Sequence, residues 1–414
     1  MLRIGPAGWD REVEGMIRRT FALVVVAALM GVACSTSNTG SQGGGSASGS
    51  ASGTPIVIGF PADLTTDWAY YDKPMEQGAQ FAVDQINDAG GILGRPLELK
   101  TVDMRDDVAE GAKVTQQLID DGAVYLIGTV GDGILAEGQV ACAAGVPIST
   151  GLGTAPTLVG GMGDCAYQLV MSDNIQAAVD AEYALKQGYK TAYLLGSNEI
   201  PYTKDLPVYF SAAFEHGGGT IVGTDEYKIG AGDYSAVVTK VTSLNPPPDA
   251  IFTPMFIPDS VVFLRQLRQA GSTIPVISTD GNADPALLDA GKKAIDGLTF
   301  SNSVCTAEGD PKVQTFYNDY KARYGKDPAS YVAVIGYDEV NLVAQAITAA
   351  GSTDPAALKD QLAHADYTGI SGHVVMDPTT RRANKPASLI QMHGTTFTCL
   401  GVQPFPSFVA PPAG

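Results

Sequence analysis

The residues best placed to do chemistry in this chain follow the ends of its predicted strands. Short apolar runs alternate with helical spacing, and aromatic, hydroxyl or carboxylate side chains come directly after many of these runs. In open α/β sheets, ligands bind beyond the carboxyl ends of the strands. Lys204 is the nearest basic residue, so these segments suit a small polar ligand better than a nucleotide. The segments in this position are 61–71, 129–133, 151–154, 197–202, 254–258 and 280–282.

Nucleotide-binding and catalytic motifs are missing. The first predicted strand continues into Pro61-Ala62-Asp63 instead of a GxGxxG turn, and no GxxxxGK(S/T) sequence occurs. HExxH and GxSxG are also absent. We therefore expect no catalysis, no cofactor and no bound metal. Four isolated histidines show no metal-ligand spacing: His216, His364, His373 and His393.

The composition is that of a folded, acidic protein. Its 414 residues allow two to three domains, and 45% of them are hydrophobic against 17% charged. Acidic residues number 44 and basic residues 26, so the formal net charge is -18. Because nucleic acids are held by clustered Lys and Arg, we expect no nucleic-acid partner. The same charge disfavours direct binding to an anionic membrane surface.

Residues 1–33 are predicted to be an export signal that is removed from the mature protein. An apolar run at 21–33 follows Arg18 and Arg19, as in a signal peptide, and is too short to span a bilayer. Acidic residues within 1–15 are atypical of such a segment and favour translation from Met16. The run ends in Gly31-Val32-Ala33-Cys34, which resembles a lipobox except that Gly31 replaces the usual aliphatic residue. Cleavage by ordinary signal peptidase is the alternative.

Cys34 is therefore expected to carry a lipid, with residues 34–53 forming the anchor and a flexible Gly/Ser tether. Without Cys34 the chain keeps an even set of cysteines, as expected in an exported protein with paired thiols. The short separation favours pairing Cys142 with Cys165, which leaves Cys305 for Cys399.

The folded part is predicted to be an α/β protein. Between the first two strands, apolar residues such as Met75, Ala79, Ala82 and Ile86 recur at helical spacing, which makes a βαβ unit. A second helix is expected at 134–144. Repeated βαβ units form parallel sheets covered by helices, and ten strands exceed one comfortable sheet, so we expect two lobes. The predicted strands are 56–60, 97–102, 124–128, 147–150, 167–171, 191–196, 220–227, 250–253, 275–279 and 298–302.

The segment 82–97, AVDQINDAGGILGRPL, resembles the leucine/isoleucine/valine-binding proteins of bacterial ABC importers. Similar segments follow in the same order, including GTAP at 153–156, LRQLRQAG at 264–271 and ISTDG at 277–281. The resemblance covers about residues 54–400. It implies two Rossmann-like lobes with parallel-rich sheets, joined by three crossovers as in type I periplasmic binding proteins.

The same resemblance implies the boundaries of the lobes. Lobe one would contain 54–171 plus 303–372, and lobe two would contain 172–302 plus 375–400. The chain would cross near 171–172, return near 302–303 and cross again near 372–375. Residues 401–414 would form a C-terminal tail.

The resemblance also implies a set of ligand-binding residues. Tyr71 would pack over the ligand, and Thr154 would contact both its carboxylate and its ammonium. Across the cleft, Asp280 would pair with the ammonium, although a helix cap before Pro285 is an alternative role for this acid. Three further positions complete the set: Leu152 through its backbone, and Tyr202 and Phe256 as aromatics.

One position departs from the family pattern. Many members place Ser in the turn after the third strand to bind the ligand carboxylate, whereas this chain has Gly131-Asp132-Gly133. Two carboxylates close together disfavour each other's ionisation. Either Asp132 turns outward while the Gly133 N–H binds the anion, or the ligand is not an ordinary α-amino acid. We favour a small polar amino-acid-like or amide ligand, and a cationic ligand is the alternative.

The resemblance therefore implies an extracytoplasmic solute-binding lipoprotein. It would be a monomer on the outer face of the cell membrane, touching the membrane only through its lipid anchor and delivering its ligand to an ABC permease. A ligand-sensing subunit that signals to a receptor is the alternative. An exported α/β enzyme is disfavoured, because no catalytic constellation is present.

Overall fold

In the computed structural model, the described residues are 52–66, 68–131, 133–283, 287–288, 292–305, 309–394 and 396–412. The predicted export signal, Cys34 and Asp132 lie outside these ranges, as does Pro285. None of the described helices is both long and apolar enough to cross a membrane.

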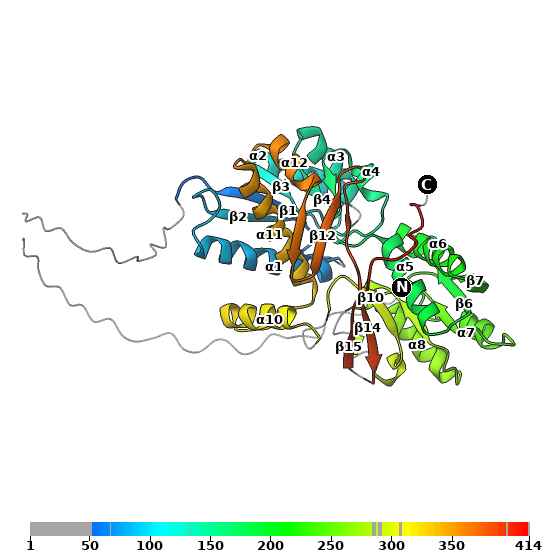
Figure 1. Ribbon diagram of the computed structural model, residues 1–414. Coiled ribbons are helices and arrows are strands. Elements are labelled where there is room, and N and C mark those ends of the chain that lie inside the picture. Colours follow the sequence, from blue (N-terminus) through cyan, green and yellow to red (C-terminus); the bar gives the residue numbers. More distant parts are fainter. Residues whose placement is uncertain are drawn as a thin grey trace, which may run out of the picture. The chain divides into compact units, whose positions relative to one another are not determined.

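The first sheet has five parallel strands in the order β2-β1-β3-β4-β5 (Figure 1). Its strands are β1 (Ile56–Ala62), β2 (Leu97–Asp103), β3 (Ala123–Leu126), β4 (Ile148–Ser149) and β5 (Ala166–Tyr167). The helices between them are α1 (Ala69–Asp88), α2 (Val108–Asp120), α3 (Ile134–Ala144) and α4 (Leu158–Met162). Both helices predicted in this part of the chain, α1 and α3, are present.

The second sheet has seven strands in the order β15-β14-β10-β9-β8-β6-β7. Five are parallel: β6 (Thr191–Gly196), β7 (Thr220–Glu226), β8 (Ala250–Phe252), β9 (Val276–Ser278) and β10 (Thr299–Asn302). Two antiparallel strands extend one edge: β14 (Ser388–His393) and β15 (Thr396–Val402). The intervening helices are α5 (Asp173–Lys186), α6 (Pro201–His216), α7 (Ser235–Thr242) and α8 (Asp259–Gln269), with short 3-10 turns η1 (Asp280–Asn282) and η2 (Lys292–Ile295).

A third, antiparallel sheet comes from the end of the chain. Its strands are β11 (Asp366–Gly369), β12 (Gly372–Asp377) and β13 (Arg382–Asn384). They follow three helices, α10 (Pro311–Tyr324), α11 (Val332–Ala350) and α12 (Pro355–Ala363). All ten predicted strands are present within a few residues, which confirms the parallel-rich α/β fold. The sequence did not predict β11–β15. Exposed residues interrupt β11, β12 and β15, so these strands leave no apolar run, whereas β14 is mostly buried but mixes polar and apolar residues.

The buried clusters show where the chain passes between the sheets. Val170 and Val304 belong to the core of the first sheet, and Met171 belongs to that of the second. Ala383 of β13 still lies in the first core, whereas Ala387 lies in the second. The third passage therefore falls at 383–387 rather than at the expected 372–375, because β12 and β13 continue as a hairpin that buries its apolar face in the first core. The assignment of whole lobes stays a prediction.

Two disulfides join the predicted pairs. Cys142 of α3 bonds Cys165 across a sequence separation of 23, and Cys305 bonds Cys399 of β15 across a separation of 94. The second bridge ties the segment after β10 to the strand at the edge of the same sheet.

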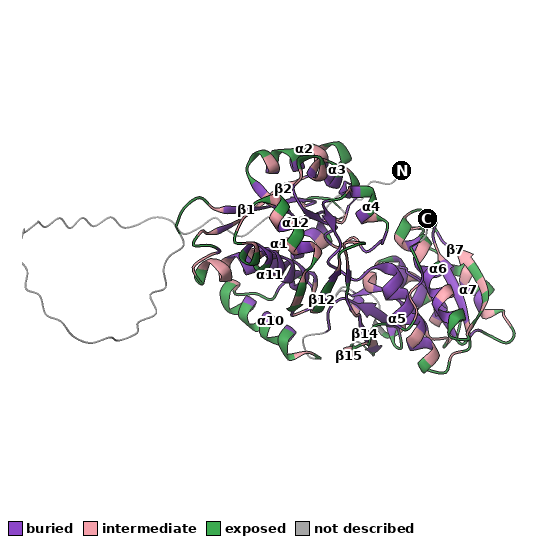
Figure 2. Cartoon of the chain, turned by 45° about the horizontal axis from the view of Figure 1, so that its top comes forward, coloured by how far each residue is buried: buried purple, intermediate pink, exposed green. Residues whose placement is uncertain are grey.

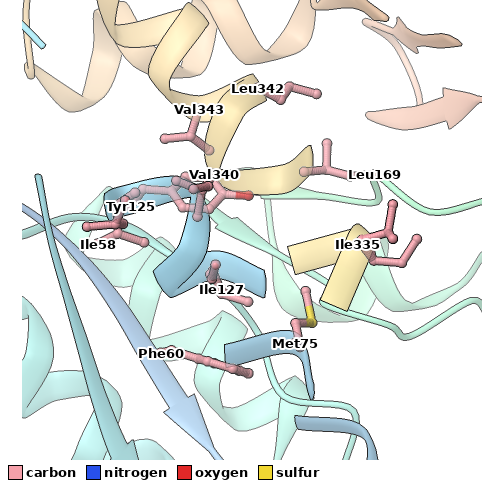
Figure 3. Close-up of a cluster of buried hydrophobic side chains, with 14 of the residues drawn as sticks. Ile58, Phe60, Met75, Tyr125, Ile127, Leu169, Ile335, Val340, Leu342 and Val343 are labelled. Atoms are coloured by element: carbon pink, nitrogen blue, oxygen red, sulfur yellow. The ribbon is translucent and has the colours of Figure 1, made fainter. Parts of the chain in front are cut away.

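The first core depends on helices from both ends of the chain. Figure 3 shows buried side chains of this core from β1, β3 and α11, among them Ile58, Tyr125 and Val340. The Tyr337 hydroxyl of α11 donates to Gln85 of α1 at 2.7 Å, across a sequence separation of 252. In Figure 2 the inner strands such as β6 are buried, whereas the edge strand β7 is only partly so and α10 exposes one face.

Paired glycines let α1 and α11 approach backbone to backbone. A Cβ on Gly78 would overlap the carbonyl of Ala333, and a Cβ on Gly336 would overlap the carbonyl of Met75. Neither obstacle is a flexible side chain, so neither helix can yield without moving its backbone. The crossing therefore requires glycine on both helices.

Gly78→Ala is expected to destabilise the protein by at least 1–3 kcal/mol, roughly the usual cost of overpacking a core. Gly160→Ala is the matched control, because that helical glycine has open space around its Cβ position. Denaturant unfolding of both variants measures the difference. Equal stability of the two variants would contradict the close helix crossing.

Candidate functional site

A cavity of about 300 Å³ lies where loops from both sheets converge. This volume is at the small end of the range for small-molecule sites. Six of the predicted ligand residues line it: Tyr71, Leu152, Thr154, Tyr202, Phe256 and Asp280. They come from segments that follow strands β1, β4, β6, β8 and β9, so the expectation of a site beyond the strand ends agrees with the geometry.

Gly133 is the predicted residue that the structure does not bring into the described lining of the cavity. A Cβ at this position would lie 2.7 Å from Met104 Cε and 3.1 Å from Glu137 Oε1. A side chain at position 133 would therefore collide with Met104 and crowd Glu137, which pack against this turn. Its neighbour Gly131 does line the cavity. Asp132 lies outside the described residues, so its predicted role stays a prediction.

Asp280 is the only charged side chain among the described residues that line the cavity. The Tyr202 hydroxyl donates to its carboxylate at 2.8 Å, and its backbone N–H donates to Gln176 Oε1 at 2.9 Å. Burial raises the pKa of Asp280, and the hydrogen bonds from Tyr202 and Gln176 oppose that rise. The carboxylate is thus held in place by a neutral donor and has room for a cationic partner on its cavity side.

Aromatic rings form the wall around Asp280. The Tyr202 hydroxyl lies 2.6 Å from Thr279 Oγ1 and accepts from Gly281 N at 3.2 Å, which fixes the tyrosine ring. Phe256 meets that ring edge-on, with centroids 6.5 Å apart. A Cβ on Gly281 would lie 2.6 Å from Phe256 Cβ, so glycine is required for this packing.

A buried polar network lies behind Asp280. Ser301 Oγ lies 3.0 Å from Gln176 Oε1 and 2.9 Å from Asp180, so its one hydroxyl hydrogen is shared between these two oxygens. Burial raises the pKa of Asp180 and of Asp173, both on α5, well above the usual range of a carboxyl. Burial therefore favours the neutral form of both groups. This side of the site is rich in acids, and Lys204 lines a different cavity.

The opposite wall is largely apolar. Trp68 precedes α1 and packs against Tyr71, with ring centroids 6.1 Å apart. A Cβ on Gly131 would lie 3.1 Å from Trp68 Cδ1, so the indole lies directly over this turn. Ile134 and other aliphatic residues of α3 and α4 continue the surface.

Two buried acids hold the turn beneath Trp68. Asp72 of α1 accepts from Thr129 Oγ1 at 2.5 Å and from the backbone N–H of Asp63 at 2.8 Å. Glu137 of α3 accepts from Thr129 N at 3.2 Å. Burial raises the pKa of Asp72 to about 7 and that of Glu137 well above its usual range. Both carboxyls therefore bind protons more tightly in the folded state than in the unfolded chain.

The titration of the Asp72 carboxyl should make the free energy of unfolding decrease as pH rises. Its carboxyl titrates at 3.8 when unperturbed and at about 7 in the folded protein. Its contribution is thus complete below about pH 4 and is lost as pH rises through 7, a total of about 4 kcal/mol. We expect Asp72→Asn to flatten the pH dependence of the unfolding free energy between pH 4 and 8.

The matched control for this comparison is Asp319→Asn, on the exposed face of α10. Denaturant unfolding at each pH provides the measurement. An unchanged slope in Asp72→Asn would mean that this carboxyl titrates as in water.

Some of the residues that line the cavity were not predicted individually from the sequence. Val130 and Ile200 follow strand ends and belong to the segments already selected. Tyr331 and Ile335 come from the start of α11, whose approach to the cavity depends on the helix crossing with α1. Others in this group are Leu135, Leu158, Val170 and Ser303.

A fold with two parallel-rich sheets and a cavity at the ends of their strands is that of a periplasmic solute-binding protein. The family model described as periplasmic binding protein matches residues 55–396. The Leu/Ile/Val-binding protein BraC3 of Rhizobium johnstonii is 30% identical over 313 residues, covering 74% of this chain and 83% of that protein. The Leu/Ile/Val-binding protein homolog 3 of Brucella melitensis is 29% identical over 310 residues, covering 75% and 83%.

Solved structures of similar proteins have the same fold. A branched-chain amino acid transporter substrate-binding protein of Streptococcus pneumoniae, in complex with isoleucine, is 27% identical with a TM-score of 0.74, covering 84% of this chain and 99% of that one. A leucine-binding protein of Thermotoga maritima is 26% identical with a TM-score of 0.73, covering 84% and 98%. The chain belongs to the leucine/isoleucine/valine-binding family of periplasmic binding proteins, which confirms the resemblance found in the sequence.

Proposed function

We propose that this protein is the extracytoplasmic solute-binding lipoprotein of an ABC importer and captures a small amino-acid-like or amide ligand. One observation carries the proposal: among the described residues that line the cavity at the strand ends, Asp280 is the one charged side chain, and most of the others are aromatic or aliphatic. An ammonium group would pair with Asp280, and an apolar body would fill the space between the two walls. The proposed ligand is therefore more specific than the small polar ligand expected from the sequence. It has a polar ammonium end and an apolar body.

Ligand capture would work by closure of the two lobes. Tyr202, Phe256 and Asp280 belong to segments that follow strands of the second sheet, whereas Tyr71, Leu152 and Thr154 follow strands of the first. A ligand that contacts both groups favours the closed state only through contacts that the open state lacks. The closed complex would then be the form that a membrane permease recognises. No cofactor and no chemical step are needed for this role.

Asp280→Asn should weaken ligand binding strongly. Loss of one partner of a buried charge pair costs on the order of 2 to 5 kcal/mol, or about 30-fold to several thousand-fold in affinity. A thermal-shift screen of amino acids, amides and amines would supply the ligand, and calorimetry would measure its affinity.

Asp319→Asn again serves as the exposed control, and it should bind normally. Trp68 provides a second readout, because it is the one tryptophan after residue 33 and lines the cavity. Ligand binding should change its emission in the wild-type protein. Normal affinity in Asp280→Asn would remove the central contact of this proposal.

The proposed lipid anchor has its own test. If Cys34 is acylated, the native protein should partition with membranes and need detergent for extraction. Cys34→Ala should release it into the soluble fraction with its ligand affinity unchanged. Wild-type protein that is fully soluble would contradict the anchor and leave the binding function intact.

A further inference from the structure

The turn after β3 uses its backbone N–H groups within the protein. Four consecutive amides donate to side-chain oxygens: Gly128 to Ser149 at 3.3 Å, Thr129 to Glu137 at 3.2 Å, Val130 to Asp72 at 3.4 Å and Gly131 to the Thr129 hydroxyl at 3.3 Å. All four accepting side chains are buried. A glycine-rich turn that leads into a helix ordinarily offers such amides to an anion. Here the protein's own acids and hydroxyls already occupy them.

A ligand carboxylate at this turn would meet two obstacles. It would have to compete for amides that are already hydrogen-bonded. It would also approach Asp72, because two oxygens that share the Val130 N–H, each about 3 Å from the nitrogen, lie within roughly 6 Å of each other. Carboxylates at that distance disfavour each other's charged forms.

The rest of the described lining offers a carboxylate no cationic partner, and its side-chain hydroxyls outside the aromatic rings belong to Thr154 and Ser303. It contains neither Lys nor Arg, and its single charge is the negative charge of Asp280. Two amides of the neighbouring turn are also engaged, since Gly151 N donates to Ser149 Oγ at 3.1 Å and Gly153 N to Thr150 O at 2.7 Å. The aromatic faces of Trp68 and Tyr202 favour a cation over an anion.

We propose that this cavity selects an apolar ligand that carries an ammonium group and no carboxylate, namely an amino-acid amide or a primary alkylamine. The inference rests on the function proposed above and narrows its ligand class. The ammonium pairs with Asp280, and the uncharged end lies against the turn formed by residues 128–131.

The test compares acids with their amides at pH 7, where an α-ammonium with a pKa of about 7.7–8.0 is mostly protonated. Calorimetry of the full chain would use L-alanine, L-valine, L-leucine and L-phenylalanine, the amide of each, and 3-methylbutylamine. The best amide or amine should bind at least tenfold more tightly than the corresponding acid. An acid that binds as tightly as its amide overturns this inference but leaves the proposed function standing. If no compound of the series binds, the proposed function fails as well.

A second experiment tests whether the turn formed by residues 128–131 causes the selection against carboxylates. Thr129→Val keeps the shape of the side chain and removes the hydroxyl that accepts from the Gly131 N–H and donates to Asp72, so this amide becomes free for a ligand carboxylate. We expect the affinity ratio of amide to acid to fall several-fold. Thr115→Val is the control, because this buried hydroxyl of α2 only donates to the carbonyl of Gly111. An unchanged ratio in Thr129→Val would show that the turn does not select against carboxylates.

Discussion

The buried carboxyl of Asp72 joins three elements that form one wall of the cavity. It lies in the first turn of α1, accepts from the backbone at the end of β1 and accepts from Thr129 in the turn after β3. Trp68 stands one turn earlier over Gly131, so its position depends on the same contacts. A charged group in this place would be costly to bury, and the rise of its pKa to about 7 records that cost.

Acids on both sides of the cavity give the site its electrostatic character. Asp173, Asp180 and Asp280 lie on one side, and Asp72 and Glu137 lie on the other. Burial favours the neutral form of most of these groups, so the interior is less negative than the count of carboxyls suggests. Asp280 keeps donors from Tyr202 and borders the cavity, which makes it the group best able to hold a charge that a ligand then neutralises.

The sequence predicted the parts of the structure that repeat a simple pattern. Apolar β-branched runs revealed the ten parallel-sheet strands, and the rule that ligands bind beyond strand ends selected the segments around the cavity. The family resemblance then pointed to Tyr71, Thr154 and Asp280 within these segments. Asp72 gave no signal, because an acid in the first turn of a helix is ordinarily a solvent-exposed partner of the helix dipole. Tyr331 could not be predicted either, since its place depends on how α11 packs against α1 from far along the chain.

The packing of α11 on α1 also affects the order in which this protein can fold during synthesis. The first sheet is complete in sequence by β5, but the side of α1 that packs on α11 stays uncovered until residues 332–350 have been made. Contacts that close such long loops form slowly. A growing chain would therefore expose the α11-binding side of α1 for most of its synthesis, a state that suits passage through a membrane before folding and that calls for chaperone protection until then.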